Sequence, residues 1–452
     1  MRTRYLTLAV ALFAIGGSLS FAQAPNAAQK KKAEAELNYP PKLTGDKTVV
    51  VDTSADFLKG PAGLKPEVRI AKAAPTVEFI YFPGQTYPGK PWSAWGESLF
   101  ANGKYYASIG DHTAPAGTAF IYEFDPTTKS FRQLVDVKKL LALPDGHYSP
   151  GKIHTTLSLG KDGWIYFGTH RGSTKVTTPA NHFTGEWIIR VNPATAVAEV
   201  VSHGPVPQHC IPTGFLDPDR LIFYGGTTPG EATTEGDGVR FFAYDVAKKK
   251  VLCDVPDGPA RAMVFAKSTG CVYFVSSKAG GLMKYDPAKG GNPTKIPGEL
   301  GLRASSEETK DGTVYTVSSV QSGKDPILYA FDTKAETIQE LGTAAVGSVG
   351  YITALKLDPT GRYLYYIPGA HGSADKDGSP VVQYDTKSNT RKVIAFLHPF
   401  YKEKYGVSVV GTYSYAVSED GADLYVTWNA NRGGKVWDVC ALTVIHIPAG
   451  ER

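Results

Sequence analysis

The stretch Gly151–Gly172, GKIHTTLSLGKDGWIYFGTHRG, carries a histidine near each end. His154 starts the first of two short apolar-rich runs, His170 ends the second, and a GKDG turn joins them. If this turn is a three-residue loop with its second glycine in the left-handed bulge position, His154 lies opposite His170. Cross-strand partners have Cβ atoms about 5 Å apart. The sequence therefore predicts two imidazoles that meet at the rim of a hairpin, an arrangement suited to proton transfer.

Other side chains able to hold charge or move protons are expected at the same rim, because they start or end short strands. Arginines that converge on a concave site bind anions through bidentate, charge-assisted hydrogen bonds. Imidazole and phenol side by side suit proton transfer. Tyr224 and Arg240 occupy one sequence unit. The residues predicted to bind the substrate are His112, His209, Arg261, Arg303, His371 and Tyr413.

One reaction needs all of these groups. In β-elimination of a uronic-acid polysaccharide, the carboxylate must be neutralised and a base must take the neighbouring proton. An acid then protonates the glycosidic oxygen that leaves. Arginine, histidine and tyrosine fit these roles, so the sequence favours an anionic polysaccharide or oligosaccharide as the partner.

Two patterns that alternate along the chain indicate which elements position these residues. Each of seven units has an aromatic-rich strand, as in WIYFGTH or CVYFVSS, and the first six also have a strand ending in a polar turn, as in YEFDPTTKS or MKYDPAKGG. A unit holds four short strands in about 42 to 60 residues, a period typical of a β-propeller. The sequence predicts an all-β fold, a seven-bladed β-propeller of four-stranded antiparallel blades over residues 46–452.

The last unit lacks an outer strand, which predicts how the ring closes. YSYAVS, DLYVTW and CALTVIHIP supply three strands before the chain stops. An N-terminal strand must complete this blade and cover its edge. The two candidates are TVEFIYF (Thr76–Phe82) and KTVVVDT (Lys47–Thr53). Residues 25–45, rich in Ala, Lys and Pro, are expected to form a flexible linker.

The N-terminus is typical of a signal peptide. Arg2 and Arg4 precede an apolar run, and AQA at 22–24 resembles a cleavage site near Ala24. We expect a periplasmic or secreted, monomeric protein without a membrane span in the mature chain; an uncleaved N-terminal anchor is the alternative.

A net charge of +5 is too small to indicate nucleic-acid binding. The four cysteines are expected to be buried small residues, although an oxidising compartment permits disulfides.

The histidines gather on one face of the predicted ring. Nine of the ten fall in or beside the connections between outer and inner strands or between second and third strands, which share one face. The tight turns of the opposite face hold Asp, Asn, Gly, Pro and Lys but no histidine. This distribution predicts a functional funnel at one mouth of the axis.

The signal peptide, the seven-bladed ring and the order His…His…Tyr…Arg resemble the propeller polysaccharide lyases, especially the ulvan lyases. Tyr224 and Arg240 lie sixteen residues apart, which is similar to the arrangement in that family. The resemblance implies that His154 and His170 act together, as the group that neutralises the carboxylate and the base that takes the proton. Tyr224 would be a proton donor or base, and Arg240 would bind the carboxylate.

Oligogalacturonate lyases, which hold a divalent metal through histidines, are also similar. That resemblance implies that four histidines could instead bind Zn, Mn or Ca. They are His112, His154, His170 and His371.

Two other functions stay open. A propeller lactonase or metal-dependent hydrolase would need acidic metal ligands on the inner rim. A non-catalytic propeller would bind a glycan or protein through Trp and Arg without turnover, and propellers host many such functions. The sequence has no G-x-S-x-G elbow, no P-loop and no dinucleotide fingerprint.

Overall fold

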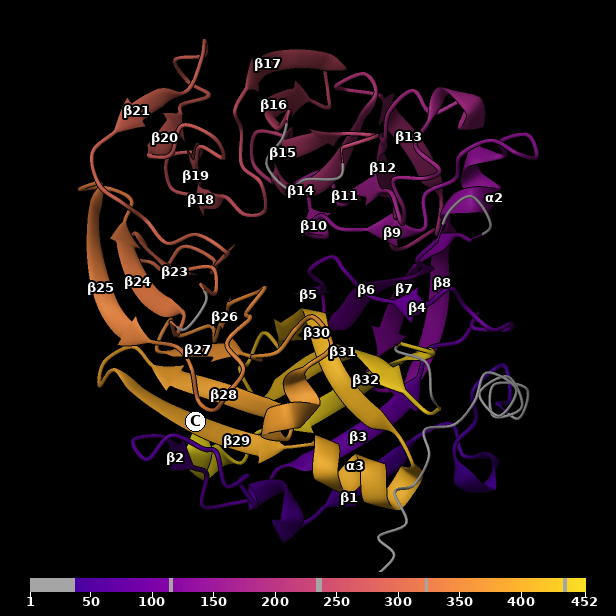
Figure 1. Ribbon diagram of the computed structural model, residues 1–452, viewed down its shortest axis with the longest axis vertical. Helices are drawn as coiled ribbons and strands as arrows, with labels where there is room; N and C mark the ends of the chain where they lie inside the picture. Colours follow the sequence, from indigo (N-terminus) through magenta and orange to yellow (C-terminus); the bar gives the residue numbers. More distant parts are fainter. Residues whose placement is uncertain (1–36, 114–116, 233–237, 322–323, 434–436) are drawn as a thin grey trace, which may run out of the picture.

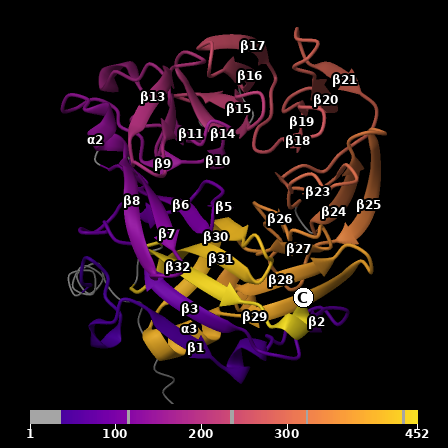
Figure 2. The same cartoon turned by 180° about the vertical axis from the view of Figure 1, so that it is seen from behind.

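Seven β-sheets follow one another around a common axis in the order of the chain (Figure 1). Each sheet is one blade, and its consecutive strands run outward from the axis (Figure 2); the N-terminal strands β1, β2 and β3 are added at the outside of the last two blades. The predicted all-β, seven-bladed propeller is therefore confirmed. The computed structural model describes residues 37–113, 117–232, 238–321, 324–433 and 437–452. The predicted signal peptide, residues 1–24, lies outside the described residues.

The first two blades have a divided inner strand and so contain five strands rather than the predicted four. Both pieces of the inner strand pair with the same second strand. Blade 1 consists of β4 (Trp92–Ser93), β5 (Leu99–Ala101), β6 (Lys104–Asp111), β7 (Ala119–Asp125) and β8 (Ser130–Asp136). Blade 2 consists of β9 (Lys152–Ile153), β10 (Ser158–Leu159), β11 (Ile165–His170), β12 (Trp187–Val191) and β13 (Ala198–His203).

The next three blades have the predicted four strands. Blade 3 consists of β14 (His209–Asp217), β15 (Ile222–Pro229), β16 (Arg240–Asp245) and β17 (Lys250–Pro256). Blade 4 consists of β18 (Val264–Ala266), β19 (Cys271–Val275), β20 (Leu282–Tyr285) and β21 (Thr294–Ile296). Blade 5 consists of β22 (Ala304–Ser305), β23 (Thr313–Val317), β24 (Ile327–Asp332) and β25 (Thr337–Thr343).

The last two blades take additional strands from the N-terminal part of the chain. Blade 6 consists of β26 (Lys356–Leu357), β27 (Tyr363–Tyr366), β28 (Pro380–Asp385) and β29 (Thr390–Phe396), with β2 (Arg69–Ile70) parallel to β29. Blade 7 consists of β30 (Ser408–Val417), β31 (Asp423–Asn431) and β32 (Val439–His446), with β3 (Thr76–Tyr81) and β1 (Val50–Thr53) outside them. Both N-terminal segments thus close the ring, β3 directly and β1 as the outermost strand.

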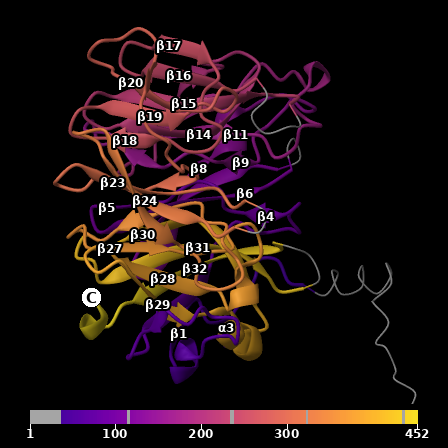
Figure 3. The ribbon, with the colours of Figure 1, turned by 60° about the vertical axis from the view of Figure 1, so that its left-hand side comes forward.

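Helices are few and short. In the described part of the chain they are α2 (Val137–Leu141), α3 (His398–Tyr405) and the 3-10 turns η1 (Thr44–Asp46), η2 (Ala55–Leu58), η3 (Pro179–Asn181), η4 (Ala374–Asp377) and η5 (Ala449–Glu451). Figure 3 shows α3 beside β1 at the closing blade. Among the described residues, no helix has the length and apolar character needed to cross a membrane. Within the segment expected to be a linker, Leu43 is buried and the Tyr39 hydroxyl donates to the Asp438 carbonyl.

One tyrosine of the second strand repeats from blade to blade and packs against the next blade. For example, Tyr106 packs with blade 2 residues, Tyr273 with blade 5 residues and Tyr425 with blade 1 residues. Blades stack because a single sheet cannot bury both of its faces. The repeated residues are Tyr106, Tyr166, Tyr224, Tyr273, Tyr315, Tyr365 and Tyr425, of which all but Tyr315 are buried.

The tight turns have the chemistry that their residues predict. In the outer hairpins, an Asp or Asn side chain accepts a backbone N–H two residues later, as Asp125 does from Thr127. In the GKDG turn, Gly163 has a positive φ of 78°, which confirms its predicted left-handed position. The four cysteines are free and buried.

Ring closure includes a histidine held between two carboxylates. His446 of β32 has Nδ1 2.7 Å from Asp423 of β31 and Nε2 3.3 Å from Glu78 of β3. Hydrogen bonds to Asp423 and then Glu78 raise the pKa of His446 to about 9, from an ordinary value of 6.5. Because the folded pKa is raised, this stabilisation is complete below pH 6.5 and is lost as the pH rises through about 9.

We therefore expect His446→Gln to destabilise the protein at pH about 6 by about 1–2 kcal/mol, a value reduced for solvent screening of a half-exposed side chain. At pH about 10 the variant and the wild type should differ little. Urea unfolding at both pH values measures this difference. An equal loss of stability at both values would show that the charge of the imidazole does not contribute.

Candidate functional site

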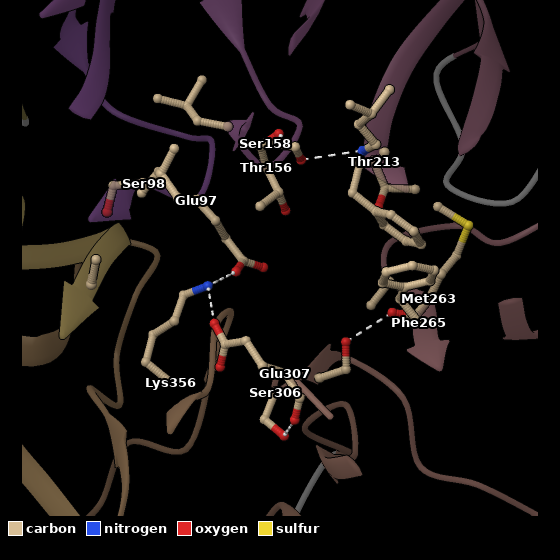
Figure 4. Close-up of a pocket in the computed structure, with 18 of the residues that line it drawn as sticks. Glu97, Ser98, Thr156, Ser158, Thr213, Met263, Phe265, Ser306, Glu307 and Lys356 are labelled. Atoms are coloured by element: carbon tan, nitrogen blue, oxygen red, sulfur yellow. Dashed lines mark hydrogen bonds and ion pairs between the residues drawn. The ribbon is translucent and has the colours of Figure 1, made fainter. Parts of the chain in front are cut away.

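The propeller axis contains a cavity of about 550 Å³. The inner strand, or the segment leading into it, contributes lining residues from every blade, and Figure 4 shows part of this lining. At the end predicted to carry the funnel, the lining residues, one from each blade in order, are Trp95, His154, Thr213, Arg261, Arg303, Thr353 and Tyr413. Residues distant in the chain therefore meet at one mouth, as the sequence predicts.

Trp95 is the centre of an aromatic cluster at this mouth. Its ring centroid lies 5.1 Å from that of His112, 5.8 Å from His154 and 5.4 Å from His371. It also lies 4.8 Å from the ring of Tyr413. The Tyr413 hydroxyl is 2.9 Å from Nδ1 of His371. The indole, which is 6% exposed, thus contacts three imidazoles and a phenol at the mouth.

Positive groups occupy the rest of the mouth. Arg303 donates through Nε and Nη2 to the Tyr351 hydroxyl at 3.1 and 2.7 Å. The Lys152 ammonium lies 4.0 Å from the centroid of the Trp95 ring. Burial, then the charges of Arg261 and Arg171, lower the pKa of Lys152 well below its ordinary value. Because these cations destabilise one another, a bound anion would be favoured here.

The imidazoles at the mouth are held in their neutral form. Burial, then the charges of Arg261, Lys152 and Arg303, lower the pKa of His154 well below its ordinary value. Burial and the charge of Lys152 also lower the pKa of His371. A neutral imidazole can accept a proton, and a phenol beside it can donate one. Burial also raises the pKa of Tyr413 above its usual range, so its proton is retained.

His154 and His170 meet, although the predicted register is wrong. The ring centroids are 5.4 Å apart. However, His170 pairs with Lys152 and not with His154, because the inner strand is interrupted between β9 and β10. Thr155 fills the interruption, and its hydroxyl accepts the Gly168 N–H at 2.8 Å. The local bulge therefore shifts the register while keeping the two imidazoles in contact.

Deeper in the cavity, a lysine is held between two carboxylates (Figure 4). The Lys356 ammonium lies 2.8 Å from Glu97 and 3.0 Å from Glu307. Burial opposes its charge, but Glu307 and Glu97 raise the pKa of Lys356 above its ordinary value. Burial also raises the pKa of Glu97, against the opposing charge of Lys356. This group gives the cavity a second polar level below the cationic mouth.

Removing the lysine should be costly. We expect Lys356→Met to lower the free energy of unfolding by about 2–4 kcal/mol, because it leaves the two carboxylates uncompensated in a partly desolvated site. The matched control is Lys59→Met, which breaks the exposed ion pair with Asp56 and should leave the free energy of unfolding nearly unchanged. Chemical denaturation measures both variants, and equal losses would contradict this account of the cavity.

Three of the predicted site residues lie elsewhere. Tyr224 does not end its strand: β15 continues to Pro229, and the tyrosine is buried against Phe241 and Tyr285 between blades 3 and 4. Arg240 begins β16 and forms an ion pair with Asp254 at 2.7 Å. Neither residue lines the axial cavity.

His209 faces a separate pocket. Its Nδ1 is 2.8 Å from the Thr227 hydroxyl, and it lines a cavity of about 180 Å³ together with Phe183 and Pro229.

The other seven predicted residues are gathered at the mouth of the axial cavity. Each either lines the cavity or has its ring in contact with a lining residue. They are His112, His154, His170, Arg261, Arg303, His371 and Tyr413.

The histidines proposed as alternative metal ligands do not form one ligand set. Among the described residues, one group of three His, Cys or carboxylate side chains has ligand atoms within 4.8 Å of one another: His170, Glu186 and Cys210. Of the four histidines, only His170 belongs to it. His112, His154 and His371 belong to no such group among the described residues.

Sequence reasoning missed Lys152, the central position of Trp95, and the Glu97–Lys356–Glu307 group. A usable signal was present for Glu97, which lies two residues after Trp95. Alternate residues of a strand face the same side, which would place Glu97 below the mouth. Both residues lie in the gap between β4 and β5, however, and the sequence does not reveal such interruptions of the inner strands.

Comparison with known proteins supports the fold of the chain but no specific activity. No protein-family model and no curated protein matches the chain. Among solved structures, an oligogalacturonate lyase in complex with manganese is similar with a TM-score of 0.53 and 13% identity, over 89% of this chain and 98% of its own. A second oligogalacturonate lyase, from Vibrio parahaemolyticus, has a TM-score of 0.51 and 11% identity, over 90% and 99%.

Hydrazine synthase from Kuenenia stuttgartiensis is equally similar, with a TM-score of 0.51 and 10% identity, over 81% of this chain and 99% of its own. Identities this low support a shared fold and not a shared activity. The chain is a seven-bladed β-propeller whose structural neighbours include oligogalacturonate lyases.

Proposed function

We propose that the protein is a polysaccharide lyase that cleaves a uronic-acid-containing glycan by β-elimination in the axial cavity. The observation that carries the proposal is the convergence of Arg261, Arg303 and Lys152 with His154 and Tyr413 at one mouth of that cavity. Cations select a carboxylate, and a neutral imidazole beside a phenol supplies a base and an acid. The oligogalacturonate lyases among the structural neighbours share the fold and are consistent with an acidic sugar.

In the proposed reaction, Arg261 and Arg303 bind the uronate carboxylate and stabilise the negative charge that develops on it. A ring nitrogen of His154 takes the proton from the carbon next to the carboxylate. The electron pair of that C–H bond forms the new carbon–carbon double bond as the glycosidic C–O bond breaks. Tyr413 donates its proton to the leaving oxygen. The His154 and Tyr413 rings lie 5.7 Å apart, close enough to act on one sugar ring.

The hydrogen-bond partners of the reacting groups support these roles. Nδ1 of His371 lies 2.9 Å from the Tyr413 hydroxyl and holds it in place. The proton taken up by His154 restores the phenolate to a phenol after the product leaves. Tyr351 accepts two hydrogen bonds from Arg303 and so fixes the direction of the guanidinium. With residues 1–24 removed as a signal peptide, the mature protein would act in the periplasm or outside the cell, as a monomer.

A metal-dependent hydrolase is the second candidate. The grouping of His170, Glu186 and Cys210 favours it, together with the carboxylates Glu97 and Glu307 in the axial cavity. A hydrolase adds water across the bond and leaves no double bond in the product. The chemistry of the product therefore distinguishes the two candidates.

A panel of uronic-acid polysaccharides and matched neutral polysaccharides tests the proposal. The protein should produce the ultraviolet absorbance of an unsaturated uronate from at least one acidic glycan and from no neutral one. His170→Ala and His154→Ala, measured beside the wild type, show whether the mouth of the cavity is responsible. New reducing ends without this absorbance would favour the hydrolase, and retention of a glycan without any product would favour a binding propeller.

A further inference from the structure

His170, Glu186 and Cys210 come together where blades 2 and 3 meet. His170 ends β11, Glu186 directly precedes β12, and Cys210 lies near the start of β14. One ligand atom from each residue lies within 4.8 Å of the other two. These three segments are separated in the chain and are brought together by the stacking of neighbouring blades. The group therefore depends on the folded propeller.

The group is inside the protein. Glu186 and Cys210 have no exposed surface, and His170 is 6% exposed. Nδ1 of His170 is buried and has no hydrogen-bond partner among the described residues. Most buried polar atoms have a partner; this nitrogen is one of ten buried side-chain atoms of the described residues without one, and an unseen ion or water is one explanation for such an atom. The unsatisfied imidazole is a second observation, independent of the grouping, that points to a ligand.

The carboxylate of the group is oriented by hydroxyl groups. Tyr148 donates a hydrogen bond to Oε1 of Glu186, and Thr169 donates one to Oε2 at 2.6 Å. Each oxygen keeps a further lone pair. Carboxylates that bind metals are commonly held in this way by outer hydrogen-bond donors, which fix their direction. The arrangement thus supplies support as well as ligand atoms.

The nearby cations are directed to other partners. The guanidinium of Arg171 donates to the carbonyl oxygens of Pro229, Gly230 and Ala232. Lys152, which pairs with His170 in the sheet, places its ammonium over the ring of Trp95. The three ligands therefore remain able to face a cation.

We propose that His170, Glu186 and Cys210 bind one divalent cation of the zinc class between blades 2 and 3. Imidazole, carboxylate and thiolate together are ligands that zinc accepts, whereas calcium requires oxygen ligands alone. Three protein ligands leave a fourth position for water or another small ligand. The ion would fix the ring of His170, which contacts His154 at the mouth of the axial cavity. The inference does not depend on the proposed lyase activity.

Metal content tests the inference without an activity assay. The full-length protein, produced in zinc-supplemented medium and purified, should carry about one zinc per chain by elemental analysis. Cys210→Ser and His170→Ala should each lower the zinc content by about tenfold or more. The matched control is Cys253→Ser, which changes another buried free cysteine outside the group and should retain the zinc. A wild-type protein without zinc, or zinc retained by both ligand variants, would overturn the proposal.

Cobalt substitution gives a readout that does not require a ligand variant to fold. Protein produced with cobalt in place of zinc should show a thiolate-to-cobalt charge-transfer band in the near ultraviolet, in the wild type and in Cys253→Ser alike. If Cys210→Ser folds, judged by circular dichroism, it should lack this band. Cobalt-containing wild-type protein without the band would exclude Cys210 as a ligand and contradict the proposal.

Discussion

Replacing His154 with alanine is expected to lower kcat for β-elimination by about 10³-fold, the usual contribution of a positioned general base. Burial and cationic neighbours lower the pKa of His154, so its imidazole is unprotonated, and its ring lies 5.7 Å from that of Tyr413, where it can take the proton. KM should change little, because the imidazole acts in the transition state more than in binding. Initial rates of double-bond formation on the acidic glycan measure both constants.

The control for this variant is His203→Ala. His203 ends β13 on the same face, stacks on Trp187 and bonds to Thr184, away from the axis. Its removal should leave kcat and KM within about twofold of the wild type, since an interaction remote from the reacting atoms makes little difference to transition-state stabilisation. Loss of activity in both variants alike would show that the face as a whole, and not His154, is required.

Replacing Arg303 with alanine is expected to lower kcat/KM by about 10²–10³-fold, the usual cost of removing one donor to a developing negative charge. The guanidinium is buried, and Tyr351 holds it toward the cavity. Arg303→Lys should recover only part of the loss, because an ammonium cannot form the bidentate contact. Tyr351→Phe should give a smaller loss, mainly in KM, because it frees the guanidinium to move.

Arg362→Ala is the matched arginine control. Arg362, in the turn between β26 and β27, forms an exposed ion pair with Asp385 at the end of β28 and does not line the cavity, so its removal should leave kcat/KM unchanged. Rates measured on the acidic glycan and on its methyl ester separate charge recognition from folding. If Arg303→Ala acted equally on both substrates, the guanidinium would not be recognising the carboxylate.

The repeat made the ring predictable, and the same repeat led to one incorrect site residue. Tyr224 occupies the buried second-strand position shared by Tyr106, Tyr166 and Tyr273, so its hydroxyl belongs to the core between blades. Its separation from Arg240 follows from the hairpin that joins β15 and β16. A spacing that is similar to a catalytic motif can therefore arise from the blade geometry alone.

Residues that start inner strands could be predicted, because every inner strand reaches the axis. Arg261 and Arg303, which lie just before β18 and β22, are at the mouth for this reason, whereas Tyr413 lies within the longer β30. Interactions that depend on inner-strand irregularities or on the stacking of two blades could not be predicted. The register of His154 depends on a bulge, and the contact of Glu186 with Cys210 depends on how blades 2 and 3 pack. Neither feature is encoded in a local sequence pattern.

The central claim is that an acidic sugar binds at the cationic mouth of the axial cavity. A crystal structure of His154→Ala with an uncleaved uronic-acid oligosaccharide tests this claim most directly. The account predicts a carboxylate within hydrogen-bond distance of Arg261 and Arg303, with the carbon next to it facing position 154 and the leaving oxygen facing Tyr413. A sugar bound on the outer surface of the blades, or bound in the cavity with its carboxylate away from both arginines, would contradict it.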